Sequence, residues 1–167
     1  MGERLTEEDV KKIQEEIEHR KLVVRKEAIE AVKEARAHGD LSENFEYYAA
    51  KKDKNKNESR IRYLEKMLKN ASIVKDESDS DEIGLNNTVE VMFEDDDTTE
   101  TYRIVTSIRG NSMMNLISIE SPIGKALLGH RVGDRVYVKV NEQMGYYLIV
   151  KSIEKTVDES MDTIKSF

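Results

Sequence analysis

Apolar residues in the first half of the chain recur at three- and four-residue steps, the spacing of one face of an α-helix. This spacing predicts a single helix over residues 6–38. Its stripe consists of Val10, Ile13, Ile17, Val24, Ala28, Ile29, Val32 and Ala35. Thr6 is suited to start the helix as N-cap, with Asp9 completing a variant of the capping box, and Gly39 is suited to end it. At about 1.5 Å per residue, such a helix is about 48 Å long.

A second helix is predicted over residues 42–71. Its apolar face consists of Phe45, Tyr48, Ala49, Ile61, Leu64, Leu68 and Ala71. A charged helix with so narrow a stripe is not stable alone, and the short connection makes its neighbour antiparallel. We therefore predict an antiparallel coiled-coil hairpin in residues 1–75, with its tip at residues 39–44.

Beyond the hairpin the apolar period changes to two, which is typical of strands. Strand-like runs bounded by turn residues occur at 88–93, 101–106, 113–119, 135–140 and 146–153. They predict a small antiparallel sheet in residues 87–155, with a short helix from Pro122 to Leu128. The acidic, serine-rich residues 76–86 predict a linker, and residues 156–167 a mobile tail. The predicted fold class is α+β.

Composition narrows the possible functions. Charged residues make up 37% of the chain and the net charge is −7. Such an acidic chain is a poor free binder of duplex DNA, so a protein partner is favoured. The chain has no cysteine, which excludes disulfides, thiolate catalysis and zinc ribbons. No apolar run approaches the roughly 20 residues that span a bilayer, and residues 1–20 are too charged for a signal peptide. We expect a cytoplasmic protein.

Acidic residues gather at the predicted tip of the hairpin. Asp40 and Glu43 lie at its end, and Glu46 follows one turn further along the second helix. Carboxylates at an exposed tip suit a hard cation such as magnesium, which prefers oxygen ligands. The Asp-x-x-Glu spacing is also that of a capping box, which needs no metal. From spacing alone, both interpretations remain open.

Two stretches of the chain resemble one protein family. From Arg36 to Tyr47 the sequence resembles the signature Arg-x-His-Gly-Asp-Leu-x-Glu-Asn-x-Glu-Tyr of the GreA/GreB family of bacterial transcript-cleavage factors. Residues 115–129, followed by Val-Gly-Asp at 132–134, are also similar to this family. The resemblance implies an FKBP-like C-terminal domain that docks on bacterial RNA polymerase. It also implies a coiled coil that passes down the secondary channel to the active site.

The resemblance implies specific roles for individual residues. Asp40 and Glu43 would make the catalytic contribution, helping the polymerase hold its second magnesium while it hydrolyses backtracked nascent RNA. The factor would not be an enzyme by itself and would hold no cofactor in isolation. Residues expected to support the tip are Arg36, Asn44, Glu46 and Tyr47. Candidates for RNA contact are Lys51, Lys52, Lys54 and Lys56, and candidates for polymerase docking are Ser121, Pro122 and Gly124.

Simpler interpretations stand beside these roles. The lysines can serve solubility alone, and Ser121-Pro122 can be no more than the start of a helix. We expect Tyr48 to pack in the hairpin and leave Tyr47 open between packing and stacking on an RNA base. The modest basic content favours the GreA branch. We also expect a monomer. Residues 107–113 lack the acidic turn common in the family, and the tail is longer than usual.

The alternative function is a regulator that binds the polymerase channel without promoting cleavage. Relatives of this kind carry altered acidic tips. The presence of both Asp40 and Glu43 argues against that alternative here.

Overall fold

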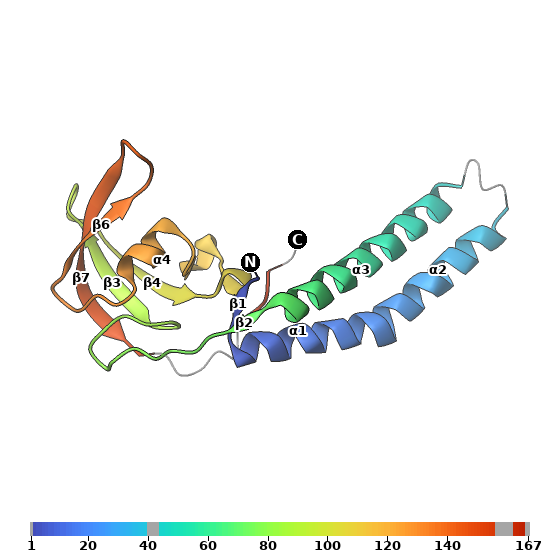
Figure 1. The fold of residues 1–167 in the computed structure, drawn as a ribbon. Helices are drawn as coiled ribbons and strands as arrows, with labels where there is room; N and C mark the ends of the chain where they lie inside the picture. Colours follow the sequence, from blue (N-terminus) through green and yellow to red (C-terminus); the bar gives the residue numbers. More distant parts are fainter. Residues whose placement is uncertain (1, 40–43, 156–161, 166–167) are drawn as a thin grey trace. The chain divides into compact units, whose positions relative to one another are not determined.

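The structure, a computed structural model, describes residues 2–39, 44–155 and 162–165. Contacts divide the chain into two compact units. The helical unit contains Val10–Ala71, and the sheet unit contains Arg4–Asp9 and Ser72–Ser166. Figure 1 shows the antiparallel helices of the first unit and the curled sheet of the second.

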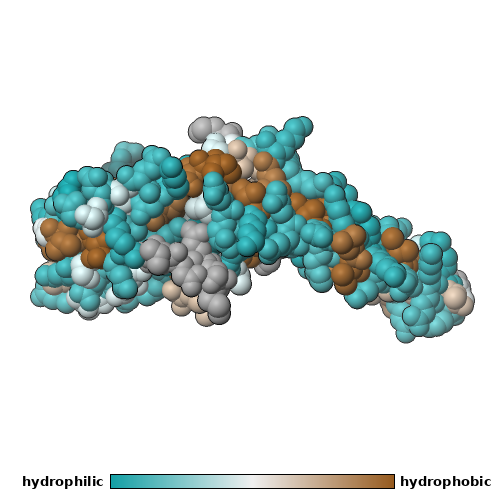
Figure 2. All heavy atoms as spheres, turned by 90° about the horizontal axis from the view of Figure 1, so that it is seen from below, coloured by the Kyte–Doolittle hydropathy of each residue, from teal (hydrophilic) through white to brown (hydrophobic). Residues whose placement is uncertain are grey.

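The helical unit is the predicted hairpin. Its first arm comprises α1 (Glu7–His19), the π-helical turn η1 (Arg20–Val24) and α2 (Arg25–Ala37), and its second arm is α3 (Phe45–Asn70). The arms lie side by side and antiparallel (Figure 1). Helix α3 begins at Phe45, later than the predicted start. On the face seen in Figure 2 the hairpin is mostly hydrophilic, with separate hydrophobic patches along it.

The first arm begins with the predicted capping box. The backbone N–H of Thr6 donates to Asp9 Oδ2 at 2.9 Å, and the N–H of Asp9 donates to Thr6 Oγ1 at 3.1 Å. Each side chain thereby satisfies an N–H group that a helix start leaves without a partner inside the helix.

The prediction of one regular helix is wrong at η1. The amide of Asn57, on α3, donates to the Arg20 carbonyl oxygen at 3.3 Å and accepts from Arg20 Nη1 at 3.0 Å. A side chain that bonds a helix carbonyl in this way favours a local break in the regular hydrogen-bond ladder. The widened turn leaves Leu22 and Val23 exposed, at 65% and 41%. The apolar stripe did not reveal it because the causative residue lies on the other arm.

The packed face of α3 differs from the predicted one. Its buried residues are Asn57, Arg60, Ile61, Leu64 and Met67. Continued toward the helix start at the same steps, this face passes the half-buried Tyr47. Phe45 and Tyr48 therefore lie off the face and are 86% and 51% exposed. The expectation that Tyr48 packs in the hairpin is wrong.

Charged residues hold the middle of the hairpin together. Glu16 accepts from Arg20 Nε at 2.7 Å and from Arg60 Nε at 2.8 Å. Burial alone would raise the pKa of Glu16, but the hydrogen bonds from these two arginines lower it below its ordinary value. Arg25 and Glu58 form a second pair across the arms, with Nε and Oε2 2.9 Å apart.

The sheet unit is built on a five-stranded sheet in the order β5-β4-β3-β7-β6. Its strands are β3 (Thr88–Phe93), β4 (Thr99–Val105), β5 (Leu116–Ser118), β6 (Arg135–Lys139) and β7 (Gly145–Glu154). All five occur where the alternation of residues predicts strands. Two further short strands, β1 (Arg4–Leu5) and β2 (Ser72–Ile73), pair in parallel.

The prediction of an antiparallel sheet is correct for β3–β4, β3–β7 and β6–β7 but wrong for β5. Strand β5 runs parallel to β4. Between these strands the chain makes two 3-10 turns, η2 (Ser107–Arg109) and η3 (Ser112–Met114). They carry it back to a point beside Arg103 of β4, so the next strand runs in the same direction.

One face of the sheet forms the core with α4 (Pro122–Leu127). The buried cluster consists of Ile83, Leu85, Val89, Val91, Ile104, Ile119, Leu127, Val136, Val138, Leu148 and Val150. Ile83 and Leu85 come from residues 76–86, for which composition predicts a linker. Their burial shows that the end of this stretch belongs to the core, because two apolar residues among acidic ones are enough to anchor it.

Residues 162–165, expected to lie in a mobile tail, contact the sheet unit instead. The Asp162 side chain is only 8% exposed.

Among the helices of the described chain, none is long and apolar enough to cross a membrane.

Candidate functional site

The two acidic residues expected to act at the tip, Asp40 and Glu43, lie outside the described residues. The structure does define what lies on either side of them. Helix α2 ends at Ala37, and Gly39 has a φ of 118°, a backbone conformation that favours glycine. Helix α3 begins at Phe45. Positions 40 and 43 therefore belong to the connection between two antiparallel helices.

Asn44 links the ends of the two helices. Its Nδ2 donates to the carbonyl oxygen of Ala35, near the end of α2, at 2.6 Å. Its Oδ1 accepts from the backbone N–H of Tyr47, in the first turn of α3, at 3.0 Å. One amide side chain thus caps α3 and bonds a carbonyl of α2, which fixes the spacing of the helices where the tip begins.

This cap bears on the alternative interpretation of the acidic pair. That interpretation made Asp40 and Glu43 a capping box for the second helix. Helix α3 takes its cap from Asn44 instead, so capping of this helix does not account for carboxylates at both positions.

Arg36 contacts Tyr47 across the hairpin. The guanidinium carbon lies 5.6 Å from the centroid of the tyrosine ring, within the range of a cation–π contact. A hydrogen bond from Arg36 lowers the pKa of the Tyr47 hydroxyl. The ring of Tyr48 stands edge-on to that of Tyr47, with centroids 5.4 Å apart. Arg36 and Tyr47 are therefore placed to hold the two helices together beside the connection.

His38 and Glu46 form a second link across the connection. His38 Nδ1 lies 3.2 Å from Glu46 Oε2, and both side chains are exposed. The pair joins the end of one helix to the start of the next, so helical spacing in the sequence does not indicate it. Glu46, grouped with the acidic tip residues by sequence, points to this histidine.

Among residues 2–39, 44–155 and 162–165, no group of three or more acidic, histidine or cysteine side chains could hold a metal ion. These ranges do not include Asp40 and Glu43, so the magnesium site at the tip stays a prediction.

The lysines expected to contact RNA follow the tip along α3. Lys51, Lys52 and Lys56 are exposed, whereas Lys54 is half-buried. Lys54 lies near Glu58, whose pKa is lowered mainly by the hydrogen bond from Arg25 and further by this lysine. Lys51, Lys52 and Lys56 are thus better placed to meet a phosphate backbone than Lys54.

The predicted docking residues form the start of α4. Ser121 Oγ accepts from the N–H of Gly124 at 3.1 Å and donates to the Ser118 carbonyl oxygen at 2.7 Å. A Cβ on Gly124 would collide with that carbonyl, so glycine is required there. Pro122 occupies the first turn of the helix. Local structure therefore explains Ser121 and Gly124 without reference to docking.

The same segment also borders a groove, which we name the sheet groove. It has a volume of about 650 Å³, and its apolar lining includes Ile117, Pro122, Ile123 and Tyr146. Its rim includes part of residues 107–113, the stretch that lacks the family's acidic turn. The sequence difference therefore falls at the edge of the surface expected to dock.

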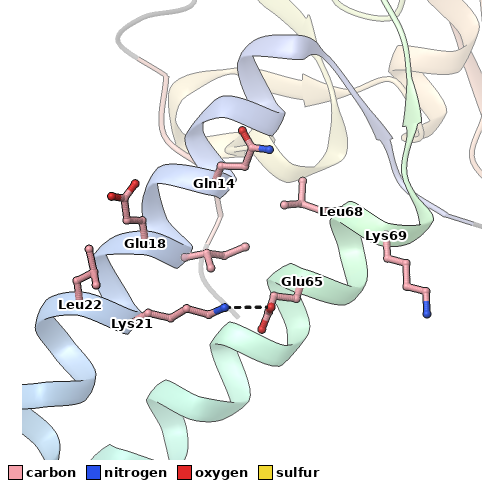
Figure 3. Close-up of a pocket in the computed structure, with 8 residues that line it drawn as sticks. Gln14, Glu18, Lys21, Leu22, Glu65, Leu68 and Lys69 are labelled. Carbon is pink, nitrogen blue, oxygen red and sulfur yellow. Dashed lines mark hydrogen bonds and ion pairs between the residues drawn. The ribbon is translucent and has the colours of Figure 1, made fainter.

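The hairpin carries a second apolar groove of about 600 Å³, lined by residues from both arms (Figure 3). Leu22 and Leu68 line it, and Lys21 Nζ approaches Glu65 Oε2 at 3.2 Å across it. Leu22 belongs to the π-helical turn, which explains its exposure here.

Comparison with known protein families matches nearly the whole chain. Residues 3–73 match the family model described as "Transcription elongation factor, N-terminal" of GreA/GreB. Residues 77–155 match the model described as "Transcription elongation factor, GreA/GreB, C-term".

Curated relatives agree with these matches. The chain is 49% identical over 137 residues to the transcription elongation factor GreA of Thermoanaerobacter pseudethanolicus, covering 81% of this chain and 87% of that one. It is 39% identical over 148 residues to GreA of Lachnoclostridium phytofermentans, covering 88% and 92%. Among solved structures, GreA factor homolog 1 of Thermus thermophilus is 28% identical with a TM-score of 0.43, covering 93% of this chain and 100% of that one.

Proposed function

Because the chain belongs to the GreA/GreB family of transcription elongation factors, we propose that it enters the secondary channel of bacterial RNA polymerase and stimulates hydrolysis of backtracked RNA. The observation that carries the proposal is the position of the family signature. Its acidic residues, Asp40 and Glu43, fall in the connection between α2 and α3, and α3 takes its cap elsewhere.

The hairpin suits the task of carrying a small group into a channel. Helix α3 has 26 residues and is therefore about 39 Å long. Each helix is about 10–12 Å across with its side chains, so a pair of helices is a narrow arm. Under this proposal residues 1–75 deliver the tip, and residues 87–155 dock on the polymerase.

The donor set at the tip fits magnesium. Two carboxylates are ligands that this ion accepts while keeping several waters. Bound jointly by factor and polymerase, the ion would supply activation of the attacking water and stabilisation of the leaving oxygen. Asp40 and Glu43 would hold it, while Asn44, the Arg36–Tyr47 contact and the His38–Glu46 contact would keep the tip in shape. Under this proposal the reaction takes place at the active site of the polymerase, and the factor is not an enzyme by itself.

The basic residues after the tip would meet the extruded RNA. The exposed Lys51, Lys52 and Lys56 lie on the first half of α3, close to the connection. Positive charge there would attract the RNA 3′ end and raise its local concentration. The protein would act in the cytoplasm as a monomer bound to polymerase.

An RNA-cleavage assay on backtracked elongation complexes tests this function. We expect Asp40→Asn and Glu43→Gln each to lower the cleavage rate at least about 10-fold, since losing even an outer-sphere metal partner costs 10–100-fold. Asp53→Asn, which removes an exposed charge from α3, is the matched control and should cleave like the parent.

Two outcomes would count against the proposal. Unchanged cleavage by both acidic variants would show that the carboxylates of the tip do not contribute to the reaction. A parent protein that slows elongation without cleaving would favour the alternative, a channel-binding regulator.

A further inference from the structure

The C-terminal residues 162–165 make specific contacts with the sheet unit. Asp162 Oδ1 accepts from Arg103 Nη1 at 2.8 Å, and Oδ2 accepts from Arg109 Nη1 at 2.6 Å. The backbone N–H of Lys165 donates to the Ile108 carbonyl oxygen at 2.6 Å. These residues follow the part of the chain that the family models match, which ends at residue 155. They are an addition to the matched sheet domain.

The site that receives Asp162 is buried and consists of charged and polar side chains. The side chains of Arg109 and Asp9 are fully buried, and those of Asp162 and Arg103 are 8% and 15% exposed. Arg109 Nε lies 2.7 Å from Asp9 Oδ1, and Thr106 Oγ1 donates to Asp9 Oδ2 at 2.6 Å. Two arginines and two aspartates therefore meet at one buried place. Without Asp162, Arg103 and Arg109 would each lose a carboxylate partner there, which is costly away from water.

The segment is held by charge more than by apolar packing. Thr163 and Lys165 are exposed, and Ile164 is half-buried. The Asp162 carboxylate and the backbone hydrogen bond of Lys165 hold this segment against the sheet unit. Such a segment can detach without opening the hydrophobic core, while its covalent tether keeps its local concentration high.

The attachment point lies beside the sheet groove. Lys165 lines that groove together with Pro122, and so does Ser107 of the η2 turn. Ile108 and Arg109, which hold the segment, belong to the same turn. The C-terminal segment thus borders the surface that the proposed function assigns to polymerase docking.

We infer that Asp162–Lys165 is an internal strap that fills an arginine-built carboxylate site and competes with polymerase for the sheet groove. The identity of the competing partner rests on the proposed function, whereas the strap itself does not. A strap that is closed most of the time lowers the apparent affinity for the partner by the fraction of molecules in which it is open.

Two variants release the strap in different ways. Asp162→Asn removes the charge that the arginines bind. Lys165→Pro removes the N–H that bonds Ile108 and leaves the four charged side chains intact, so it serves if the first variant fails to fold. Glu154→Gln removes an exposed carboxylate at the end of β7 and is the charge-matched control.

Hydrogen exchange and polymerase affinity are then measured on the full chain. We expect the backbone amides of the strap, Asp162–Lys165, to exchange at least about tenfold faster in both release variants. We expect both to bind polymerase about 3–10-fold more tightly, as for a strap closed in most molecules. The control should match the parent in both measurements.

Each failure has a distinct meaning. Equally fast exchange in the parent and the release variants would overturn the strap. Faster exchange in the release variants with an unchanged affinity for polymerase would overturn the competition. A parent that does not bind polymerase at all would overturn the proposed function and the competition together, while the exchange data would still decide whether the strap exists.

Discussion

The helical unit and the sheet unit use buried charge in different ways. In the hairpin, Glu16 meets Arg20 and Arg60 in an interface that water partly reaches, since Glu16 and Arg20 are 22% and 30% exposed. In the sheet unit, Asp9 and Arg109 are fully buried. In the hairpin Arg60 is buried but its partner Glu16 keeps some contact with water, whereas in the sheet unit neither Asp9 nor Arg109 is exposed. Losing a charge should therefore cost far more in the sheet unit.

The largest effect is expected at Arg109. Replacing it with Ala leaves Asp9 buried without its arginine, and we expect a loss of about 3–5 kcal/mol in the free energy of unfolding. Urea unfolding followed by circular dichroism measures this. Lys139→Ala breaks only an exposed pair with Glu142 and should cost less than about 1 kcal/mol. A similar cost for both variants would break the contrast between buried and exposed charge.

A smaller effect is expected at Gly124. Its replacement by Ala forces a Cβ against the Ser118 carbonyl, which should cost about 1–3 kcal/mol. Gly110→Ala is the control, because a Cβ there makes only ordinary contacts. Thermal melting of both variants tests whether close packing at α4 limits the stability of the sheet unit. Equal melting temperatures would show that the turn yields to the added group.

Within the hairpin, we expect Arg60→Met to cost about 1–2 kcal/mol, because Glu16 loses one of its two arginines but keeps Arg20 and some water. Glu58→Gln should cost less than about 1 kcal/mol, since both members of its pair with Arg25 remain partly exposed to water. Helix content as a function of urea reports both. If Arg60→Met lowered the free energy of unfolding as much as the Arg109 variant does, the two units would not differ in the cost of losing a charge.

The smallest effect is a dependence on pH in the hairpin. The pKa of Glu16 is lowered in the folded state from its ordinary 4.5, so its contribution is present above that pH. It is lost as the pH falls through the lowered pKa, because protonation ends the pairing with Arg20 and Arg60. Glu16→Gln should flatten this part of the curve of helix content against pH. Identical curves for the parent and the variant would show that the Glu16 carboxylate adds nothing to the stability of the hairpin.

Features that repeat along the sequence were predictable. The stripe from Val10 to Ala35 predicted the first arm, and alternation predicted all five strands of the sheet. The Thr6–Asp9 cap was also predictable, because its partners lie three residues apart.

Features that depend on distant partners were not. Asn57 bonds to the π-helical turn from 37 residues away, and Arg109 meets Asp162 across 53 residues. The parallel direction of β5 follows from two turns, the second of which includes residues 113 and 114 that the alternation assigned to a strand. At the candidate site, the order of residues placed carboxylates at the predicted tip. Only the resemblance to a family assigned them a function.

The magnesium dependence of RNA cleavage tests the central claim most directly. On one preparation of backtracked complexes, the concentration of magnesium that gives half-maximal cleavage is measured with the parent and with Asp40→Asn at saturating factor. If the tip helps the polymerase hold its ion, the variant requires a higher concentration and recovers as magnesium is raised. An unchanged half-maximal concentration would contradict a role for Asp40 in binding the ion.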